Sequence, residues 1–432
     1  MKNNIFRQTA FEMRQQPLIT SVSLIGTAFA IFLMMVVMMI QSVRTVPMAP
    51  ESNRPLMMYG MWFDAIIEGS TTSSGMSLPL AQRIYSGLDG VESITFMGNG
   101  VESIDVDAPG RTPVNLYMRE SDAGFWKVFD HTFVAGSPYG QVNVDAPTEN
   151  RVAVLSEDAV RQVLGCTPDE AIGRTVNISQ KPTTVIGVVK SSSPLAPYGF
   201  AQVFRPIIPE RHAWDARGYY GSVMAAMVIK PGTTREHLQQ QVKARYAEID
   251  TELKPGGGET RYHEQPFDHE LSLAPMGSNT TPDNSKEKRE RAILMLILLL
   301  VPAINMSSLT QSRLKRRYAE VGVKRAYGAP RNRILAEILT ENFIITLVGG
   351  AIGLILSILA AFLLTDTVFA GMTGEDDNFS AISVSASLPL NAVFNWAMFG
   401  FALACCFLLN LLSAGIPAWR ASRVSPVEAL HS

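Results

Sequence analysis

The chain has 432 residues, of which 47% are apolar and 18% charged, and its formal net charge is -2. This length allows more than one domain, since domains usually run to about 100–200 residues. The balanced charge argues against a nucleic-acid partner because phosphate binding needs a basic face. Of the three cysteines, Cys405 and Cys406 fall in an apolar run. Only Cys166 would lie outside a membrane, so cysteine usage does not reveal the compartment.

The first apolar run covers residues 18–40 and follows Lys2, Arg7 and Arg14. It carries no charge and is long enough to cross a hydrocarbon core of about 30 Å. A cleavable signal peptide is the alternative, because a basic start before an apolar core fits both interpretations. The run is longer than a typical signal core and no Ala-x-Ala site follows it cleanly. We therefore predict a transmembrane helix over 18–42, preceded by a cytoplasmic amphipathic segment over 1–17.

Three further runs cover residues 292–312, 342–365 and 392–419, and each is free of Asp, Glu, Lys and Arg. Buried helices of a soluble protein are the alternative. Four uncharged runs of at least about 20 residues favour membrane spans instead. The predicted fold class is an α-helical membrane domain of four transmembrane helices, with an α+β domain inserted between the first and second. The last three spans are predicted over 290–312, 338–365 and 391–419.

The charges of the loops set the predicted topology. Within the loop over 313–337, the stretch from Arg313 to Arg333 carries eight Lys and Arg residues and is opposed only by Glu320. Residues 366–390 carry acidic residues and no Lys or Arg. The positive-inside rule places the basic loop in the cytoplasm. Both termini, including the tail over 420–432, then lie in the cytoplasm, and residues 43–288 and 366–390 lie outside.

The long segment between the first two spans reads as mixed α+β. Residues 151–155, 184–189 and 223–229 are rich in apolar and β-branched residues and predict strands. A short helix is predicted over 157–164, capped by Ser156, and a longer one over 235–253 after a turn. Strands followed by helices indicate small βαβ-type units in one or two subdomains.

We find no catalytic constellation in this segment. His263, Glu264 and His269 lie in the sequence HEQPFDH, which is not a His-Glu-x-x-His pattern and has no obvious third ligand. We interpret them as solvated loop residues and predict no metal site. The chain has no Gly-x-Ser-x-Gly elbow, and the dipeptide Gly-Lys occurs nowhere, which excludes a Walker phosphate-binding loop. We predict that the chain is not an enzyme and holds no cofactor.

The basic loop has an order that goes beyond charge. Residues 318–327 predict a short amphipathic helix, and Gly328, Ala329 and Pro330 then turn the chain. A second helix would start near Arg331 and run into the third span. A basic loop beside a membrane is usually a topology marker or a contact for anionic lipids. A short rigid helix in this place would also transmit force from a bound partner to the two spans that it joins.

The chain here resembles the MacB/FtsX-type ABC transporter permeases. Their signature, Arg-x-x-Glu-Ile-Gly-x-Arg-x-Ala-x-Gly-Ala, is matched by Arg317, Glu320, Val321, Gly322, Lys324, Arg325, Ala326, Gly328 and Ala329. Glu341, the glycines 349, 350 and 353, and the end of the chain from Pro417 to Leu430 also match the family. Residues 125–136 and the strands at 151–155 and 184–189 resemble its periplasmic core domain.

The resemblance implies a permease subunit in the bacterial inner membrane with a periplasmic domain. It implies that a separate ABC ATPase dimer binds ATP and Mg, since only about 17 residues precede the first span. It further implies a second permease copy or a related permease, contacts with membrane lipids, and a periplasmic adaptor, outer-membrane factor or lipoprotein as further partners. The ATPase-coupling contact is assigned to Arg317, Glu320, Gly322, Lys324, Arg325, Gly328, Ala329 and Arg331.

Several residues inside the spans predict helix packing. Gly349, Gly353 and Ser357 form a stripe of small residues on the third span, suited to packing within one subunit or between two. In the second span, Pro302 predicts a kink and Asn305 a hydrogen bond to a neighbouring helix. The centres of the spans lack charged residues, which argues against an ion-coupled transporter.

These features predict a permease that couples ATP hydrolysis by its partner to movements of the extracytoplasmic domain. It would export or extract a lipoprotein, peptide or drug from the outer side of the membrane. The alternative is a transmembrane signalling or scaffold protein that regulates a periplasmic partner such as a cell-wall hydrolase.

Overall fold

The computed structural model describes residues 17–67, 69–140, 151–214, 218–274, 280–297, 327–370 and 399–405, together with residues 300, 323, 396, 407, 408 and 411. The chain divides into two compact units. The first comprises Met1–Val43, Ser285–Thr365 and Leu390–Ser432, and the second is built on Arg44–Asn284 with Asp366–Pro389. The boundaries near residues 43 and 284 lie within a few residues of those predicted for the inserted domain.

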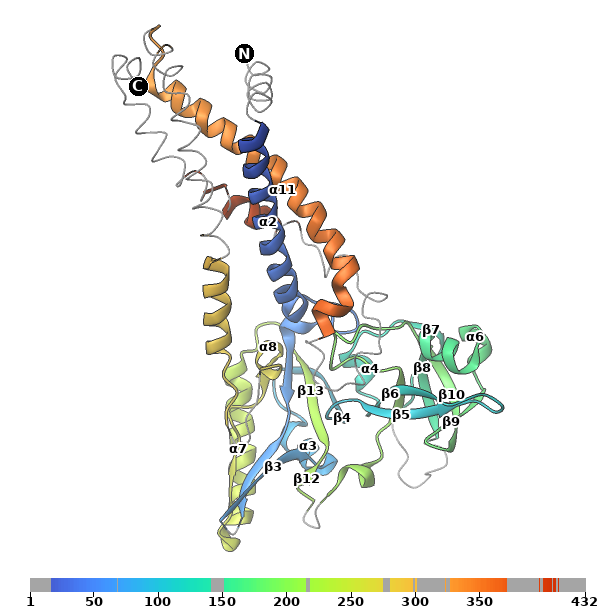
Figure 1. Cartoon of the computed structure of the whole chain (residues 1–432). Coiled ribbons are helices and arrows are strands. Elements are labelled where there is room, and N and C mark those ends of the chain that lie inside the picture. The colour runs from blue at the N-terminus through green and yellow to red at the C-terminus, as the bar shows by residue number, and fades with distance from the viewer. Residues whose placement is uncertain are drawn as a thin grey trace. The chain divides into compact units, whose positions relative to one another are not determined.

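Among the described residues of the first unit, two helices are long and apolar enough to cross a membrane, coloured blue and orange in Figure 1. Helix α2 spans Pro17–Thr45 and contains the candidate span Thr20–Met39, with a mean hydropathy of 2.5. Helix α11 spans Arg331–Ala370 and contains the candidate span Phe343–Ala361, also with a mean hydropathy of 2.5. The first and third predicted spans therefore coincide with these helices.

The other two predicted spans lie largely outside the described residues. A helix covers residues 285–297, which include the start of the second predicted span. Helical residues at 399–405 fall inside the fourth. A total of four spans, and the side of the membrane on which each loop lies, remain predictions.

The second unit is an α+β domain with two lobes. In Figure 1, α3, α7 and β12 lie in one lobe, and α6, β8 and β10 lie in the other. The strands follow the order β11-β8-β10-β9-β5-β6-β4-β13-β3-β2-β14, in which β1 pairs with β13 and β15, β12 with β3, and β7 with β10. The two lobes therefore share one continuous hydrogen-bonded sheet, which passes between them through β6, β4 and β13.

Lobe one is covered by helix α7, Arg235–Leu253, which matches the predicted helix. The Thr234 side chain accepts a hydrogen bond from the His237 backbone and caps the helix. Its buried residues recur every three or four positions and line one face: Leu238, Val242, Tyr246, Ile249 and Leu253. The remaining elements of this lobe are η1 Arg54–Leu56, β1 Met57–Gly60, β2 Phe63–Ile67, β3 Ser70–Met76, α3 Leu78–Tyr85, β4 Val91–Gly98, β12 Tyr220–Gly221, β13 Val223–Ile229, η4 Lys254–Gly256, β14 Glu259–Arg261, β15 Phe267–Asp268 and α8 His269–Ser272.

Lobe two contains the predicted βαβ-type unit. Strand β8, Val152–Ser156, runs parallel to β10, Lys181–Val189. Between them, α5 Glu157–Ala159 continues into the π-helical turn η2 Val160–Leu164, and the Ser156 side chain caps α5 as predicted. The other elements of this lobe are β5 Glu102–Asp107, β6 Val114–Ser121, α4 Phe125–Val128, β7 Phe133–Gly136, α6 Pro168–Ala171, β9 Thr175–Ile178 and β11 Val203–Pro206, followed by η3 Pro209–His212.

Candidate functional site

The chain enters the α+β domain from α2 through residues 46–56, which we call the N-terminal connector. It carries a buried ion pair: Arg54 Nε lies 2.8 Å from Glu51 Oε2, and the two side chains are 1% and 0% exposed. Arg54 also donates to the Val46 carbonyl at 3.0 Å and to the Leu195 carbonyl at 2.6 Å. A buried charge pair is tolerated only when its remaining donors and acceptors are satisfied. The connector is thereby fixed to a loop about 140 residues further along the chain.

That loop, residues 195–200, is the centre of the candidate site, and we call it the junction loop. Glu51 Oε1 accepts hydrogen bonds from the backbone N–H groups of Tyr198 at 2.8 Å and Gly199 at 2.9 Å. A Cβ built at Gly199 would lie 2.5 Å from Pro50 Cγ and 3.1 Å from Phe129, so the connector and the loop touch with no room for a side chain. The loop and the connector therefore form one packed block.

Lobe two holds the same loop through Arg119 on β6, a residue that is 1% exposed. Its guanidinium donates to the carbonyls of Pro197 at 2.7 Å, Phe200 at 3.2 Å and Gly98 at 3.1 Å. Burial lowers the pKa of Arg119 to about 10, and the negative charge of Glu51 partly opposes this shift. The Arg119 side chain stays charged at neutral pH and donates hydrogen bonds to three backbone carbonyls.

His131, just beyond α4, adds a further donor. Its Nε2 lies 3.0 Å from the Gly199 carbonyl oxygen, so this nitrogen carries the proton. The ring packs against Phe125 and Phe204, with centroids 5.5 Å and 5.0 Å away. Burial lowers the pKa of His131 to about 4, which keeps the imidazole neutral at physiological pH.

The chain leaves the domain through residues 262–274, the C-terminal connector, which returns to the same place. Strand β15 pairs antiparallel with β1, Tyr59 opposite Phe267. The Tyr59 hydroxyl lies 3.1 Å from His269 Nδ1, and His269 Nε2 lies 3.8 Å from Glu51 Oε2. The Tyr198 hydroxyl donates to the Ser272 carbonyl at 3.1 Å. Both connectors therefore meet the junction loop in one buried polar cluster.

The interpretation of His263 and His269 as solvated loop residues is wrong. Both are buried, and His263 Nε2 lies 2.5 Å from Asp64 Oδ2. Burial lowers the pKa of His269 to about 4. Their partners Asp64 and Tyr59 lie about 200 residues earlier, so nothing near HEQPFDH in the sequence indicated burial. Glu264 is exposed as predicted. Within the described ranges, no three His, Cys, Asp or Glu side chains gather as a metal would require.

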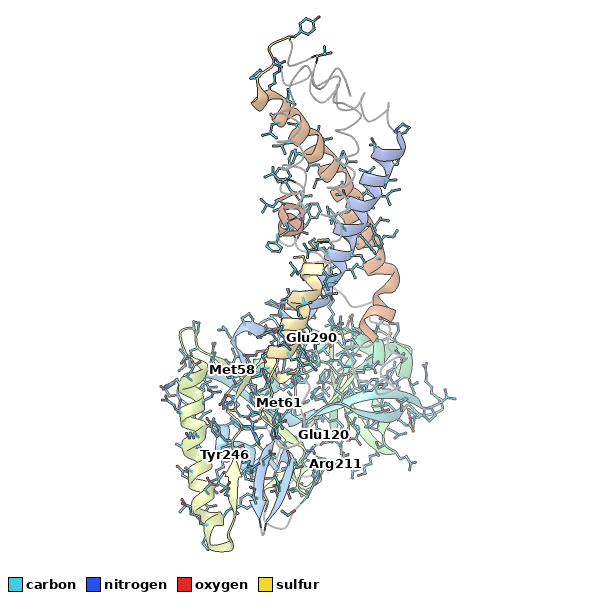
Figure 2. All side chains as sticks on the ribbon, turned by 60° about the vertical axis from the view of Figure 1, so that its left-hand side comes forward. Met58, Met61, Glu120, Arg211, Tyr246 and Glu290 are labelled. Atoms are coloured by element: carbon cyan, nitrogen blue, oxygen red, sulfur yellow. The ribbon has the colours of Figure 1, made fainter. Side chains whose placement is uncertain are left out.

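A second polar cluster lies beside β6. The Glu120 carboxylate is bound by Arg211 at 2.8 Å and by His212 Nε2 at 2.8 Å, and Figure 2 shows Glu120 and Arg211 next to each other. Burial raises the pKa of Glu120, but the His212 hydrogen bond and the Arg211 charge outweigh it and lower the pKa overall. The carboxylate is therefore ionised at neutral pH. Nothing in the sequence singled out either cluster.

Part of the predicted ATPase-coupling segment is described. Gly328 has φ +83°, a left-handed conformation that favours glycine, and Tyr327 N–H donates to the Val323 carbonyl at 3.1 Å. Helix α11 then begins at Arg331, three residues after Gly328. The remaining coupling residues lie outside the described residues: Arg317, Glu320, Gly322, Lys324 and Arg325. Their role stays a prediction.

The stripe of small residues on α11 faces α2 within the first unit. A Cβ built at Gly349 would lie 3.0 Å from Thr27 Cβ, and one at Gly353 would lie 2.5 Å from the Ala28 carbonyl oxygen. Ser357 is fully buried. Close approach of two helix backbones is what such stripes allow. Pro302 and Asn305 fall outside the part of the chain that the structure describes.

Comparison with known proteins identifies the family. Residues 18–245 match the MacB-like periplasmic core domain, and residues 292–426 match the FtsX-like permease C-terminal family. The first match alone covers more than half of the chain. The chain therefore belongs to the MacB/FtsX-type permeases of ABC transporters, which confirms the resemblance carried by its motifs.

Curated relatives include the macrolide export ATP-binding/permease protein MacB of Escherichia coli K12, 23% identical over 71% of this chain and 42% of the relative. MacB of Chromobacterium violaceum is 25% identical over 66% of this chain and 39% of the relative. The chain spans about two fifths of the length of these relatives.

Two solved structures share weak similarity. A domain of a permease protein from Porphyromonas gingivalis is 18% identical with a TM-score of 0.37, and covers 48% of this chain and 88% of its own. The periplasmic region of MacB from Actinobacillus actinomycetemcomitans is 15% identical with a TM-score of 0.33, and covers 48% of this chain and 89% of its own.

Proposed function

We propose that this protein is the permease subunit of an ABC transporter whose ATPase is a separate subunit, and that it transmits ATP-driven movement of its membrane helices to its extracytoplasmic domain. The work would be done on a lipoprotein, peptide or drug at the outer side of the membrane. A second permease copy or a related permease would complete the complex. Membership of the permease family supports this proposal, as do the two apolar helices.

The proposed mechanism rests on one observation: Glu51 contacts both the N-terminal and the C-terminal connector. The chain runs from α2 into the N-terminal connector, and from the C-terminal connector towards the helix at 285–297. Glu51 contacts Arg54 of the first connector, the backbone of the junction loop and, at 3.8 Å, His269 of the second. A displacement of either connector would therefore act on the same buried cluster and not on a flexible tether.

We infer that ATP hydrolysis takes place on an ATPase outside these 432 residues. Hydrolysis of ATP by a P-loop enzyme needs a Gly-Lys dipeptide in its phosphate-binding loop, and these 432 residues contain none. The matched relatives are named ATP-binding/permease proteins, so their names join ATP binding and permease function in one protein, and this supports an ATP-binding component for the present permease. We place the contact with that partner on residues 318–330, with Glu320 and Arg325 as its polar groups.

The proposal is tested by purifying the tagged full-length chain from its own membranes, identifying the proteins that accompany it and assaying ATP hydrolysis. Recovery of a Walker-motif ATPase is expected. Charge reversal at both Glu320 and Arg325 should abolish stimulated hydrolysis, while Lys181→Glu, at an exposed position of the extracytoplasmic domain, should leave it unchanged. Intact hydrolysis and transport in the double charge-reversal variant would overturn the proposal. An ATPase that accompanies the chain together with a cell-wall hydrolase, without substrate release, would favour the signalling or scaffold alternative.

A further inference from the structure

Strand β6 carries two buried charged residues in succession, Arg119 and Glu120, which are 1% and 5% exposed. Successive side chains of a strand point to opposite faces of the sheet. Arg119 therefore reaches one side and Glu120 the other, and a shift of β6 moves both. Burial of charged groups is costly unless they are paired or fully hydrogen-bonded, so each side of the strand is held by its partners.

On one side, Arg119 holds the junction loop through the carbonyls of Pro197 and Phe200, at 2.7 Å and 3.2 Å. On the other side, Glu120 holds residues 207–214, which we call the η3 connector. Arg211 and His212 of this connector each lie 2.8 Å from the carboxylate. The Ile207 N–H also donates to the Ser121 carbonyl at 2.9 Å, so the connector is anchored to β6 at two points.

A third path joins the two sides. Arg119 donates to the Gly98 carbonyl at 3.1 Å, and the N–H of the next residue, Asn99, donates to the Ser222 carbonyl at 2.7 Å. Ser222 Oγ lies 2.6 Å from His212 Nδ1. Hydrogen bonds and adjacent residues therefore form a closed ring from Arg119 through Ser222 and His212 to Glu120 and back to Arg119.

The η3 connector also reaches the surface. The Trp214 side chain is 63% exposed, and the Trp214 backbone N–H donates to the Tyr220 carbonyl at 2.9 Å. Tyr220 belongs to β12, which pairs with β3 of lobe one. The connector thus links β6 in the middle of the sheet to the outer part of lobe one, and it presents an aromatic side chain to solvent.

We propose that this ring is a relay: a disturbance of the junction loop at Glu51 changes the stability of the η3 connector, through Arg119 and Glu120. Glu51 itself bonds to Arg54, Tyr198 and Gly199, and its effect on the connector passes through β6. The inference concerns coupling inside the extracytoplasmic domain and does not depend on the proposed ATPase partner. Coupling between two sites is reciprocal, so a disturbance at Ser222 would equally loosen the junction loop.

Amide hydrogen exchange of the full-length protein in detergent, read by peptide, tests the relay as a double-mutant cycle. Glu51→Gln is expected to accelerate exchange in residues 207–214 roughly fivefold or more, the lower range of typical allosteric coupling. Glu120→Gln alone should also accelerate it, and Glu51→Gln added to Glu120→Gln should have no further effect there. Glu252→Gln, at a surface ion pair with Arg83, is the control and should leave these peptides unchanged.

Peptides from β8 and β10 report whether each variant remains folded. The relay would be overturned if Glu51→Gln accelerated amide exchange only in residues 195–200. It would also be overturned if the two substitutions accelerated exchange in residues 207–214 independently, so that their effects multiplied in the double variant. If Glu51→Gln unfolds the domain, Ser222→Ala decides the question, because it removes one hydroxyl of the ring. Faster exchange in residues 195–200 is then expected, and unchanged exchange there would refute the proposal.

Discussion

Glu51 and Tyr198 lie 147 residues apart in the chain, and the Glu51 carboxylate accepts a hydrogen bond of 2.8 Å from the Tyr198 backbone. This contact joins the connector that follows α2 to the loop held by Arg119 and His131. The N-terminal connector, which follows α2, is therefore bound to the rest of the extracytoplasmic domain through a buried polar block. This block gives three predictions, and the packing of α2 against α11 gives a fourth.

The first prediction concerns the buried ion pair. Glu51→Ala leaves the Arg54 guanidinium buried without its carboxylate, and loss of one partner of such a pair costs roughly 3–5 kcal/mol. The thermal unfolding temperature of the extracytoplasmic domain should fall by many degrees. Glu252→Ala removes an ion pair whose side chains are 36% and 49% exposed, and should change stability by about 1 kcal/mol or less. Equal shifts for the two variants would contradict the importance of the Glu51 cluster.

The second prediction concerns contact between the connector and the loop. Gly199→Ala adds a methyl group 2.5 Å from Pro50 Cγ, and such overpacking costs about 1–3 kcal/mol. Gly256→Ala is the matched control, since a Cβ there meets nothing within 4 Å. Denaturation curves of the two variants should separate clearly, with Gly256→Ala close to the parent protein. An unchanged denaturation midpoint for Gly199→Ala would show that the connector and the junction loop are not tightly packed at this position.

The third prediction concerns acid. Burial lowers the pKa values of His131 and His269 to about 4 from 6.5, so the unfolded chain binds more protons than the folded chain between these values. The stability that the folded protein gains from these two neutral histidines is fully present above pH 6.5 and is lost as the pH falls toward 4. The variant His131→Asn/His269→Gln should lose less stability than the parent over this range, measured by thermal unfolding at several pH values. His237→Gln, at a half-exposed position, should follow the parent, and parallel curves for all three proteins would contradict the assignment.

The fourth prediction concerns packing of α2 against α11. Because a Cβ at Gly349 lies 3.0 Å from Thr27 Cβ, cysteines at these two positions are within reach of a disulfide. In a background with Cys166, Cys405 and Cys406 replaced by Ser, Thr27→Cys/Gly349→Cys should crosslink within one chain and migrate as a monomer. A crosslinked dimer band would instead place the stripe between two subunits. Exposed Ile25 supplies the control pair, Ile25→Cys/Gly349→Cys, which should react poorly.

Local features of the sequence predicted much of the fold. The sequence predicted helix α7 from the turn that precedes it, and α5 from the cap at Ser156. The two described spans followed from length and absence of charge. The residues Gly328, Ala329 and Pro330 predicted the turn and the start of α11 near Arg331.

The junction could not be predicted in this way. Glu51, Arg54 and Arg119 are charged residues that a single sequence assigns to the surface, and their burial depends on partners brought together from distant segments. The same holds for His269, whose partner Tyr59 lies 210 residues earlier. Within β6, the apolar residues Leu116, Tyr117 and Met118 are followed directly by Arg119, Glu120 and Ser121, a pattern that does not indicate burial of the charged pair.

The most direct test of transmission through the junction is amide hydrogen exchange of the junction loop, residues 195–200, in the full complex with its ATPase. Exchange is compared between the nucleotide-free state and the vanadate-trapped state. Trapping is expected to change the exchange rate of the junction loop roughly fivefold or more, and this change should be lost when Glu320 and Arg325 are reversed in charge. Identical exchange in the two nucleotide states, in a complex that hydrolyses ATP, would show that the movement does not reach the extracytoplasmic domain through this junction.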